Sequence, residues 1–495
     1  MTPIDTRRRL VFGAPLAVLL PSCALVPAAA PTQDTAAILV QLDAATGSSK
    51  VASLSFVAVG SGGSVGQAFA PGQAWPALNY ARLARRMDYG KAAFAEDYVR
   101  IRSEPAGGGM LPLMGQGEAR AAGFAVGEHA WNGGPNNAAI PSPLGLDGRV
   151  HDLWTSPHGV LHAARRWAAK AGTARDANRT FATLVFSVPD HLEAVAWIDD
   201  QGLLSRVDAR MPHPVLGDTA VTTRYLHWSP IGNGVSFPMR IRQTLGGFDA
   251  LDVAVQSVEL NPAFELSVPE NVRQFKERVR AEPVADGVWF LTEGSHNSVL
   301  VEMSDHLMLI ECPVDDARAA AVFTEARRLV PSKPVRYVVN THHHFDHAGG
   351  LRAAAAEGAT LVTSEVARPY YERIFANPNR IRPDRLAQSG RSPTFIGISG
   401  SRVFGDGRRS VEVHEVQDSV HSQGLLIVYL PAERLLVEAD SYTPGLYTNP
   451  ALVNANNQNL ADNIDRRALK VDRILPLHGR VSPMSEFLGV IGRKS

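Results

Sequence analysis

Four histidines directly after an apolar segment restrict the possible folds of this chain more than any other feature. Residues 335–340, V-R-Y-V-V-N, have the length and composition of a buried β-strand, and residues 341–350 read T-H-H-H-F-D-H-A-G-G. Successive side chains of an extended chain point to opposite sides. We therefore expect His342 and His344 to share one side and His343 to point to the other.

The chain is expected to bend after these histidines, because Gly349-Gly350 opens the helix that follows. At such a bend Asp346 and His347 can turn toward the same space as the two histidines that share a side. The pattern is H-x-H-x-D-H, which places three imidazoles and a carboxylate around one cavity. Neutral imidazoles and carboxylates suit a borderline cation such as zinc.

Cysteine ligands are not expected in this site. The chain has only two cysteines, Cys23 and Cys312, which excludes a disulfide framework and a four-cysteine zinc site. Any bound metal must therefore be held by nitrogen and oxygen ligands.

Length and composition indicate a large globular protein. A chain of 495 residues predicts two or three domains, and 45% hydrophobic with 20% charged residues is typical of a soluble protein. Basic and acidic residues number 49 each, so the chain lacks the basic excess that phosphate binding needs. We expect a small-molecule substrate and no nucleic acid partner. The oligomeric state stays open.

Residues 1–30 are typical of an export signal. Three arginines at residues 7–9 precede an apolar stretch at residues 10–20, and small residues follow. The apolar stretch is about half the length that spans a bilayer, so a permanent transmembrane helix is not expected. The chain is therefore predicted to be extracytoplasmic, in a bacterial periplasm or associated with an outer membrane.

Two kinds of signal fit this segment. Thr6–Leu10 resembles a twin-arginine signal, whereas Leu20–Cys23 resembles a lipobox, which would make Cys23 a lipid attachment point and the sole contact with a membrane. Cleavage after Ala28–Ala30 is the alternative, and it stays open.

Residues 36–272 are predicted to form a β-rich α+β domain. Alternating apolar and polar residues flank turns at 200–202 and 232–234 and indicate two hairpins. Helices are predicted at residues 81–87 and 158–171. The meander of long antiparallel strands resembles the open half-barrels of periplasmic lipoprotein carriers.

Residues 279–495 are predicted to form an α/β domain. Short apolar strands alternate there with helices, such as the amphipathic helix expected at residues 316–329.

Three further potential ligands lie next to predicted strands in this second domain. His421 precedes the strand L-L-I-V-Y-L, Asp440 ends the strand R-L-L-V-E-A-D, and His478 follows the strand R-I-L-P-L. Together with H-x-H-x-D-H, their order and context resemble the metallo-β-lactamase superfamily. The resemblance covers residues 279–495 and implies an αββα sandwich, here preceded by the β-rich domain.

The resemblance also implies two zinc ions per chain, with iron or manganese as alternatives. The implied ligands form two sets bridged by Asp440: His342, His344 and His421 for one ion, and Asp346, His347 and His478 for the other. A hydroxide shared by the two ions would attack the substrate, since metal binding lowers the pKa of water from about 15.7 to about 7. Asp346 would orient this nucleophile and accept its proton, which makes it the expected catalytic residue.

Three residues are predicted to contact substrate. His296 and Asn297 lie where the superfamily has a hairpin that borders the active site. Tyr442, two residues after Asp440, is placed to donate a hydrogen bond to a developing oxyanion.

These features predict an exported dinuclear zinc hydrolase that cleaves an ester, lactone, thioester or related bond. The bridging aspartate argues against a dedicated β-lactamase, but β-lactam hydrolysis stays as an alternative. A second alternative is a protein whose β-rich domain binds a lipid or another apolar ligand, with a secondary metal site.

Overall fold

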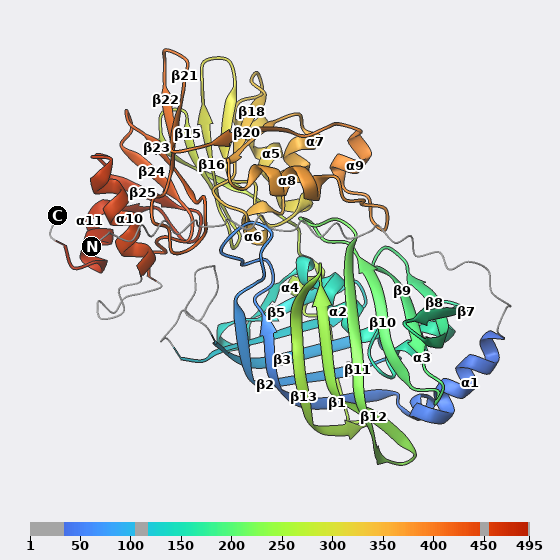
Figure 1. Ribbon diagram of the computed structural model, residues 1–495. Coiled ribbons are helices and arrows are strands. Elements are labelled where there is room, and N and C mark those ends of the chain that lie inside the picture. Colours follow the sequence, from blue (N-terminus) through green and yellow to red (C-terminus); the bar gives the residue numbers. More distant parts are fainter. Residues whose placement is uncertain (1–33, 104–116, 446–454, 494–495) are drawn as a thin grey trace, which may run out of the picture.

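The computed structural model describes residues 34–103, 117–445 and 455–493. Strands β1 to β13 form one sheet, and β14 to β26 form two further sheets (Figure 1). The predicted export signal, with Cys23, lies outside the described residues. Within them, every helix is too short or too polar to cross a membrane.

The N-terminal region is built on one antiparallel sheet of 13 strands. Its first strand, β1 (Ser53–Gly63), pairs with its last, β13 (Phe248–Leu260), in the middle of the sheet. Strands β6 (Ala139–Pro141) and β7 (Lys170–Asp176) form the two edges, so the sheet is open. The others are β2 (Ala77–Asp88), β3 (Ala93–Arg102), β4 (Ala119–Val126), β5 (His129–Gly133), β8 (Arg179–Val188), β9 (Leu192–Ile198), β10 (Leu204–Met211), β11 (Thr219–Gly232) and β12 (Val235–Leu245).

Helices pack on one face of this sheet. They are α1 (Thr35–Thr46), α2 (Leu146–Trp154) and α3 (Gly159–Arg166), and their apolar side chains share one buried core with those of the strands. Trp154 and Leu161, for example, lie in the same core as strand residues such as Phe56 and Leu184. The N-terminal region is thus β-rich with a few helices. Its likeness to lipoprotein carriers stays a prediction.

Of the elements predicted in the N-terminal region, the structure confirms the two hairpins and corrects the two helices. The two hairpins are confirmed, because β9 pairs with β10 and β11 with β12. The helix predicted at residues 81–87 is wrong, since these residues lie in β2 and pair with β1 and β3. Hydrogen bonds and packing on both sides outweigh helix propensities that differ by only a few tenths of a kcal/mol per residue. The helix predicted at 158–171 is shorter and ends at Arg166.

The C-terminal region is a sandwich of two sheets. The first contains β14 (Arg280–Ala285), β15 (Val288–Thr292), β16 (Ser298–Glu302), β17 (Leu307–Ile310), β18 (Val335–Val339), β19 (Thr360–Ser364) and β20 (Thr394–Ile398). The second contains β21 (Ser401–Gly405), β22 (Ser410–Glu415), β23 (Leu426–Leu430), β24 (Leu435–Glu438), β25 (Arg473–Pro476) and β26 (Ser482–Pro483). Apolar side chains of both sheets meet in one buried core between them.

Helices cover both outer faces of the sandwich. The first sheet packs on α5 (Asp316–Leu329), α7 (Leu351–Ala356) and α8 (Arg368–Phe375), whereas the second packs on α10 (Ala455–Arg466) and α11 (Met484–Val490). The layers are therefore αββα, as predicted, and α5 has the predicted bounds. The described residues also form three short α-helices, which are α4 (Glu270–Arg273), α6 (Phe345–Ala348) and α9 (Arg385–Ser389).

The two regions contact each other next to α6. The loop that joins β1 and β2, residues 64–76, extends from the sheet toward α6 and is called the β1–β2 loop below (Figure 1). The ring of Phe345 in α6 lies edge-on to Trp75 of this loop, with 6.4 Å between ring centroids. Farther away, the guanidinium of Arg382 pairs with the buried carboxylate of Asp147.

Candidate metal centre

The residues predicted as metal ligands gather where several strands of the sandwich end. His342 follows β18, Asp440 follows β24 and His478 follows β25, while His421 lies in the connection from β22 to β23. Strands β24 and β25 run parallel, so the residues that follow them lie at the same edge. All seven predicted ligands are brought together there, in two adjoining clusters.

The first cluster contains three imidazoles and one carboxylate. Nε2 of His342 lies 2.9 Å from Nδ1 of His344 and 3.2 Å from Nε2 of His421. An oxygen of Asp440 lies 3.3 Å from Nε2 of His342. These four potential ligand atoms lie within 4.8 Å of one another. Three imidazole nitrogens that converge on one point are the arrangement that a bound cation requires.

The second cluster adjoins the first, because Oδ2 of Asp440 lies near both His342 and His347. Nε2 of His347 lies 3.1 Å from Nε2 of His478 and 3.6 Å from Oδ2 of Asp346. His296 also belongs to this cluster, because its Nε2 lies 3.1 Å from Oδ2 of Asp346. The clusters together therefore offer one more imidazole than the predicted ligand set contains.

Asp440 lies between the two clusters. Its Oδ2 is 2.8 Å from Nε2 of His347 and 3.4 Å from Nε2 of His421, and its Oδ1 is 3.2 Å from Nε2 of His478. This is the position that a bridging carboxylate would occupy. Its backbone has a φ of 59°, in the left-handed region that few residues other than glycine adopt. Such strained backbone often occurs at functional sites.

The electrostatics of the clusters fit a cation. Burial, followed by the neighbouring imidazoles, lowers the pKa of His342 and His344 well below the usual value, so both rings are neutral, as metal ligands must be. At His347, burial also acts to lower the pKa, but the carboxylates of Asp440 and Asp346 outweigh it and raise the pKa well above the usual value. The site thus attracts positive charge.

His343 takes part in neither cluster. Its ring is buried, and Nδ1 lies 3.3 Å from the hydroxyl oxygen of Ser422. The side chain therefore points to a different environment from that of His342 and His344, as alternation along an extended chain predicts.

Two buried glutamates contact a predicted ligand or the backbone next to one outside the clusters, and neither was predicted from the sequence. Oε2 of Glu311 lies 3.0 Å from Nδ1 of His347, the ring nitrogen opposite the cluster, and Oε1 accepts the backbone N–H of Thr341. Glu438 accepts the backbone N–H groups of Ser441 and Tyr442 and so fixes the turn that carries Asp440. Each glutamate lies at a strand end, which is the signal that could have drawn attention to it.

Burial changes the protonation of one of these glutamates. The side chain of Glu438 is fully buried, and burial, followed by the negative charge of Asp440, raises its pKa to about 8. Its carboxyl group is therefore neutral near pH 7, which avoids a second negative charge beside Asp440.

The three predicted substrate contacts lie in different environments. His296 faces Asp346, as described above. Asn297 is buried, and its side-chain amide donates to the carbonyl oxygens of Pro476 and Gly479, so it holds the segment that carries His478. Tyr442 is also buried, with its hydroxyl 3.3 Å from that of Ser482 and its ring against Phe487. The polar contacts of Asn297 and Tyr442 are thus to neighbouring protein groups, and their predicted contact with substrate stays a prediction.

Comparisons with known proteins place the sandwich in a family. Residues 291–476 match the model of the Metallo-beta-lactamase superfamily. A relative, 2,4-dinitroanisole O-demethylase subunit alpha of Nocardioides sp., is 24% identical over 183 residues, which cover 37% of this chain and 52% of the relative. The chain thus spans about half the length of the curated relative it matches.

Solved structures align with the same part of the chain. A metallo-beta-lactamase from Pontibacter korlensis is 18% identical, with a TM-score of 0.35, and the match covers 43% of this chain and 98% of that one. The FIM-1 enzyme of Pseudomonas aeruginosa in its mono-zinc form is 19% identical, with a TM-score of 0.33, covering 44% of this chain and 95% of that one.

The match to the family model places residues 291–476 in the metallo-β-lactamase superfamily. Members of this superfamily are hydrolases or related enzymes, and the fold typically binds metal ions.

Glu311→Gln is expected to weaken zinc binding about 10–100-fold, the usual effect of losing a partner behind a metal ligand. The amide keeps the volume of the side chain but lacks the negative charge that holds the Nδ1 proton of His347. Competition with a chelator measures the zinc affinity, and thermal unfolding checks the fold. Glu357→Gln, on a surface glutamate that pairs with Arg327, is the matched control. Equal zinc affinity in both variants would contradict this role.

Proposed function

We propose that this protein is an exported hydrolase that uses two zinc ions per chain. The observation that carries the proposal is Asp440, whose two oxygens face imidazoles of both clusters at 2.8–3.4 Å. One ion would be held by the first cluster and the other by the second, with Asp440 shared. Nitrogen and oxygen donors in these numbers suit zinc, while iron and manganese are alternatives.

The protein residues would position and deprotonate a water molecule. Bound zinc ions supply Lewis-acid chemistry, because they lower the pKa of water and polarise a substrate oxygen. Asp346 is the residue suited to accept the proton, since its side chain is 32% exposed and its Oδ2 faces the second cluster. His296 contacts the same oxygen and would hold the carboxylate in place.

The proposed substrate is a small molecule with an ester, lactone, thioester or related bond. Chemistry of this kind needs no nucleophile from the protein, because water takes that part. β-Lactam hydrolysis is the alternative. Because one relative is named as a 2,4-dinitroanisole O-demethylase subunit, the ether bond of an aryl methyl ether should also be tested.

Binding of a lipid by the N-terminal sheet is less well supported. A lipid carrier needs an apolar cavity, but the helical face of this sheet is filled by side chains of α1, α2 and α3. Export itself is proposed from the sequence of residues 1–30, and with it an extracytoplasmic location and a possible lipid anchor at Cys23.

The proposal is tested by metal content and turnover. Purified protein is expected to contain two zinc ions per chain by elemental analysis and to hydrolyse at least one member of a panel of esters, lactones, thioesters, β-lactams and 2,4-dinitroanisole. Dialysis against a chelator should abolish turnover, and added zinc should restore it. Protein that is replete with metal but inert across the panel would overturn the hydrolase in favour of a binding role.

A further inference from the structure

The β1–β2 loop of the N-terminal region contacts the ligands of both clusters. The side-chain amide of Gln67 donates a hydrogen bond to Oδ1 of Asp346 at 2.9 Å, and the carbonyl oxygen of Ala68 lies 2.9 Å from Nε2 of His344. These contacts join residues that are more than 270 positions apart in the sequence. They bring the N-terminal region into direct contact with the metal centre.

Each contact is made to the atom opposite the one that faces the cluster. Nδ1 of His344 faces His342, so a neutral ring carries its proton on Nε2 and donates it to Ala68. Likewise, Oδ2 of Asp346 faces the second cluster, whereas Oδ1 accepts from Gln67. Hydrogen bonds of this kind fix the orientation of metal ligands, and the loss of one typically lowers the metal affinity by about 10–100-fold.

The loop is held tightly in this position. The backbone N–H of Phe345 donates to the carbonyl oxygen of Gly66, and that of Gln423 donates to the carbonyl oxygen of Phe69. Gly66 has a φ of 79°, and a Cβ atom there would lie 2.3 Å from the ring of Phe345. Only glycine therefore allows this close approach of the two regions.

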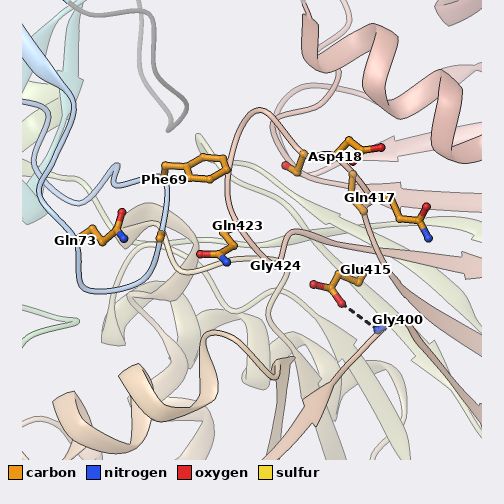
Figure 2. Close-up of a pocket in the computed structure, with 11 residues that line it drawn as sticks. Phe69, Gln73, Gly400, Glu415, Gln417, Asp418, Gln423 and Gly424 are labelled. Carbon is orange, nitrogen blue, oxygen red and sulfur yellow. Dashed lines mark hydrogen bonds between the residues drawn. The ribbon is translucent and has the colours of Figure 1, made fainter. Parts of the chain in front are cut away.

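A cavity of about 620 Å³ is lined by a later part of the loop, which includes Phe69, Ala70 and Gln73. Figure 2 shows Phe69 and Gln73 of the loop on one side of it and Gln423 and Glu415 on the other. Gln73 thus belongs to the same loop as Gln67 but faces this cavity, which makes it a suitable control.

We propose that the metal centre is a two-region site, in which Gln67 and Ala68 of the N-terminal region hold Asp346 and His344 in their metal-binding orientations. Gln67 is a positioning residue for the second metal ion. The proposal rests on the metal binding proposed above and adds a role for the N-terminal region. It explains why the β1–β2 loop leaves its own sheet to pack against α6.

Gln67→Met in the full-length protein tests the proposal, because methionine keeps the length of the side chain and removes the amide donor. Competition between the protein and a chelator for zinc is expected to show affinity about 10–100-fold lower for one of the two ions, with the other little changed. In protein loaded with cobalt, the visible absorption of the bound ions should also change, since the geometry around one ion is altered. The thermal unfolding midpoint of the metal-free variant should stay that of the metal-free wild type, because weaker metal binding by itself lowers the midpoint of the loaded protein.

Gln73→Ala is the matched control and should retain the zinc affinity and the cobalt spectrum of the wild type. Wild-type protein that binds two zinc ions, with Gln67→Met binding both as tightly and with the same cobalt spectrum, would overturn the two-region site and leave the hydrolase intact. Equal weakening in Gln67→Met and Gln73→Ala would also overturn it. Wild-type protein that binds no metal overturns both proposals.

Discussion

His342→Ala is expected to remove one zinc ion and nearly all turnover, whereas His343→Ala should keep both ions and most turnover. Nε2 of His342 lies at the centre of the first cluster, next to nitrogens of His344 and His421. We expect the loss of kcat/KM in His342→Ala to exceed the roughly 10–100-fold effect of losing an outer partner, because a direct ligand is missing. Elemental analysis and steady-state kinetics measure both effects.

His343→Ala also controls for the general effect of removing a buried histidine from this segment. His343 is buried, so His343→Ala should lower the free energy of unfolding by about 1–3 kcal/mol through loss of packing. Denaturant unfolding separates this loss of stability from a loss of metal. Equal loss of zinc from both variants would show that the direction of these side chains has been misjudged.

Asp440→Asn is expected to have the second large effect, on both metal ions together. The amide has nearly the same shape but lacks the negative charge that faces imidazoles of both clusters. Without that charge, the two cations would repel each other with less compensation, so we expect no more than one ion to bind tightly. Zinc content and kcat/KM should both fall, and kcat/KM by at least the effect expected for His342→Ala.

Asp418→Asn is a close match for this substitution. Asp418 also has a left-handed backbone, with a φ of 57° against 59° for Asp440, but it lies near the surface and pairs with Arg466. Both variants therefore test the same exchange in the same backbone conformation. If Asp440→Asn retained two zinc ions and its activity, the bridging role would be refuted.

Local sequence predicted the elements of the C-terminal sandwich better than those of the N-terminal sheet. The helix at residues 316–329 and the strand before His342 were predictable because their apolar spacing matches the side of each element that is buried. Residues 81–87 failed because their alanines, leucine and arginines favour a helix in isolation, while pairing with β1 and β3 is decided by segments far along the chain.

The candidate site shows the same division. The seven predicted ligands could be chosen from sequence because each stands beside a predicted strand and fits one superfamily pattern. Gln67 could not, because nothing in its own segment indicates its partner Asp346, 279 residues away. Glu311 and Glu438 stand at strand ends, but the strand-end position alone does not indicate the contact of Glu311 with His347, 36 residues away.

The sequence by itself therefore determined the type of domain, the residue types of the candidate metal centre and the side to which His342, but not His343, would point. These properties depend on short-range periodicity and on a pattern of residues at strand ends. Only the tertiary structure decided that His296 joins the second cluster, that Tyr442 and Asn297 bond to Ser482 and Pro476, and that the β1–β2 loop contacts His344 and Asp346. Such contacts arise when separate elements pack, and packing is not encoded in any one segment.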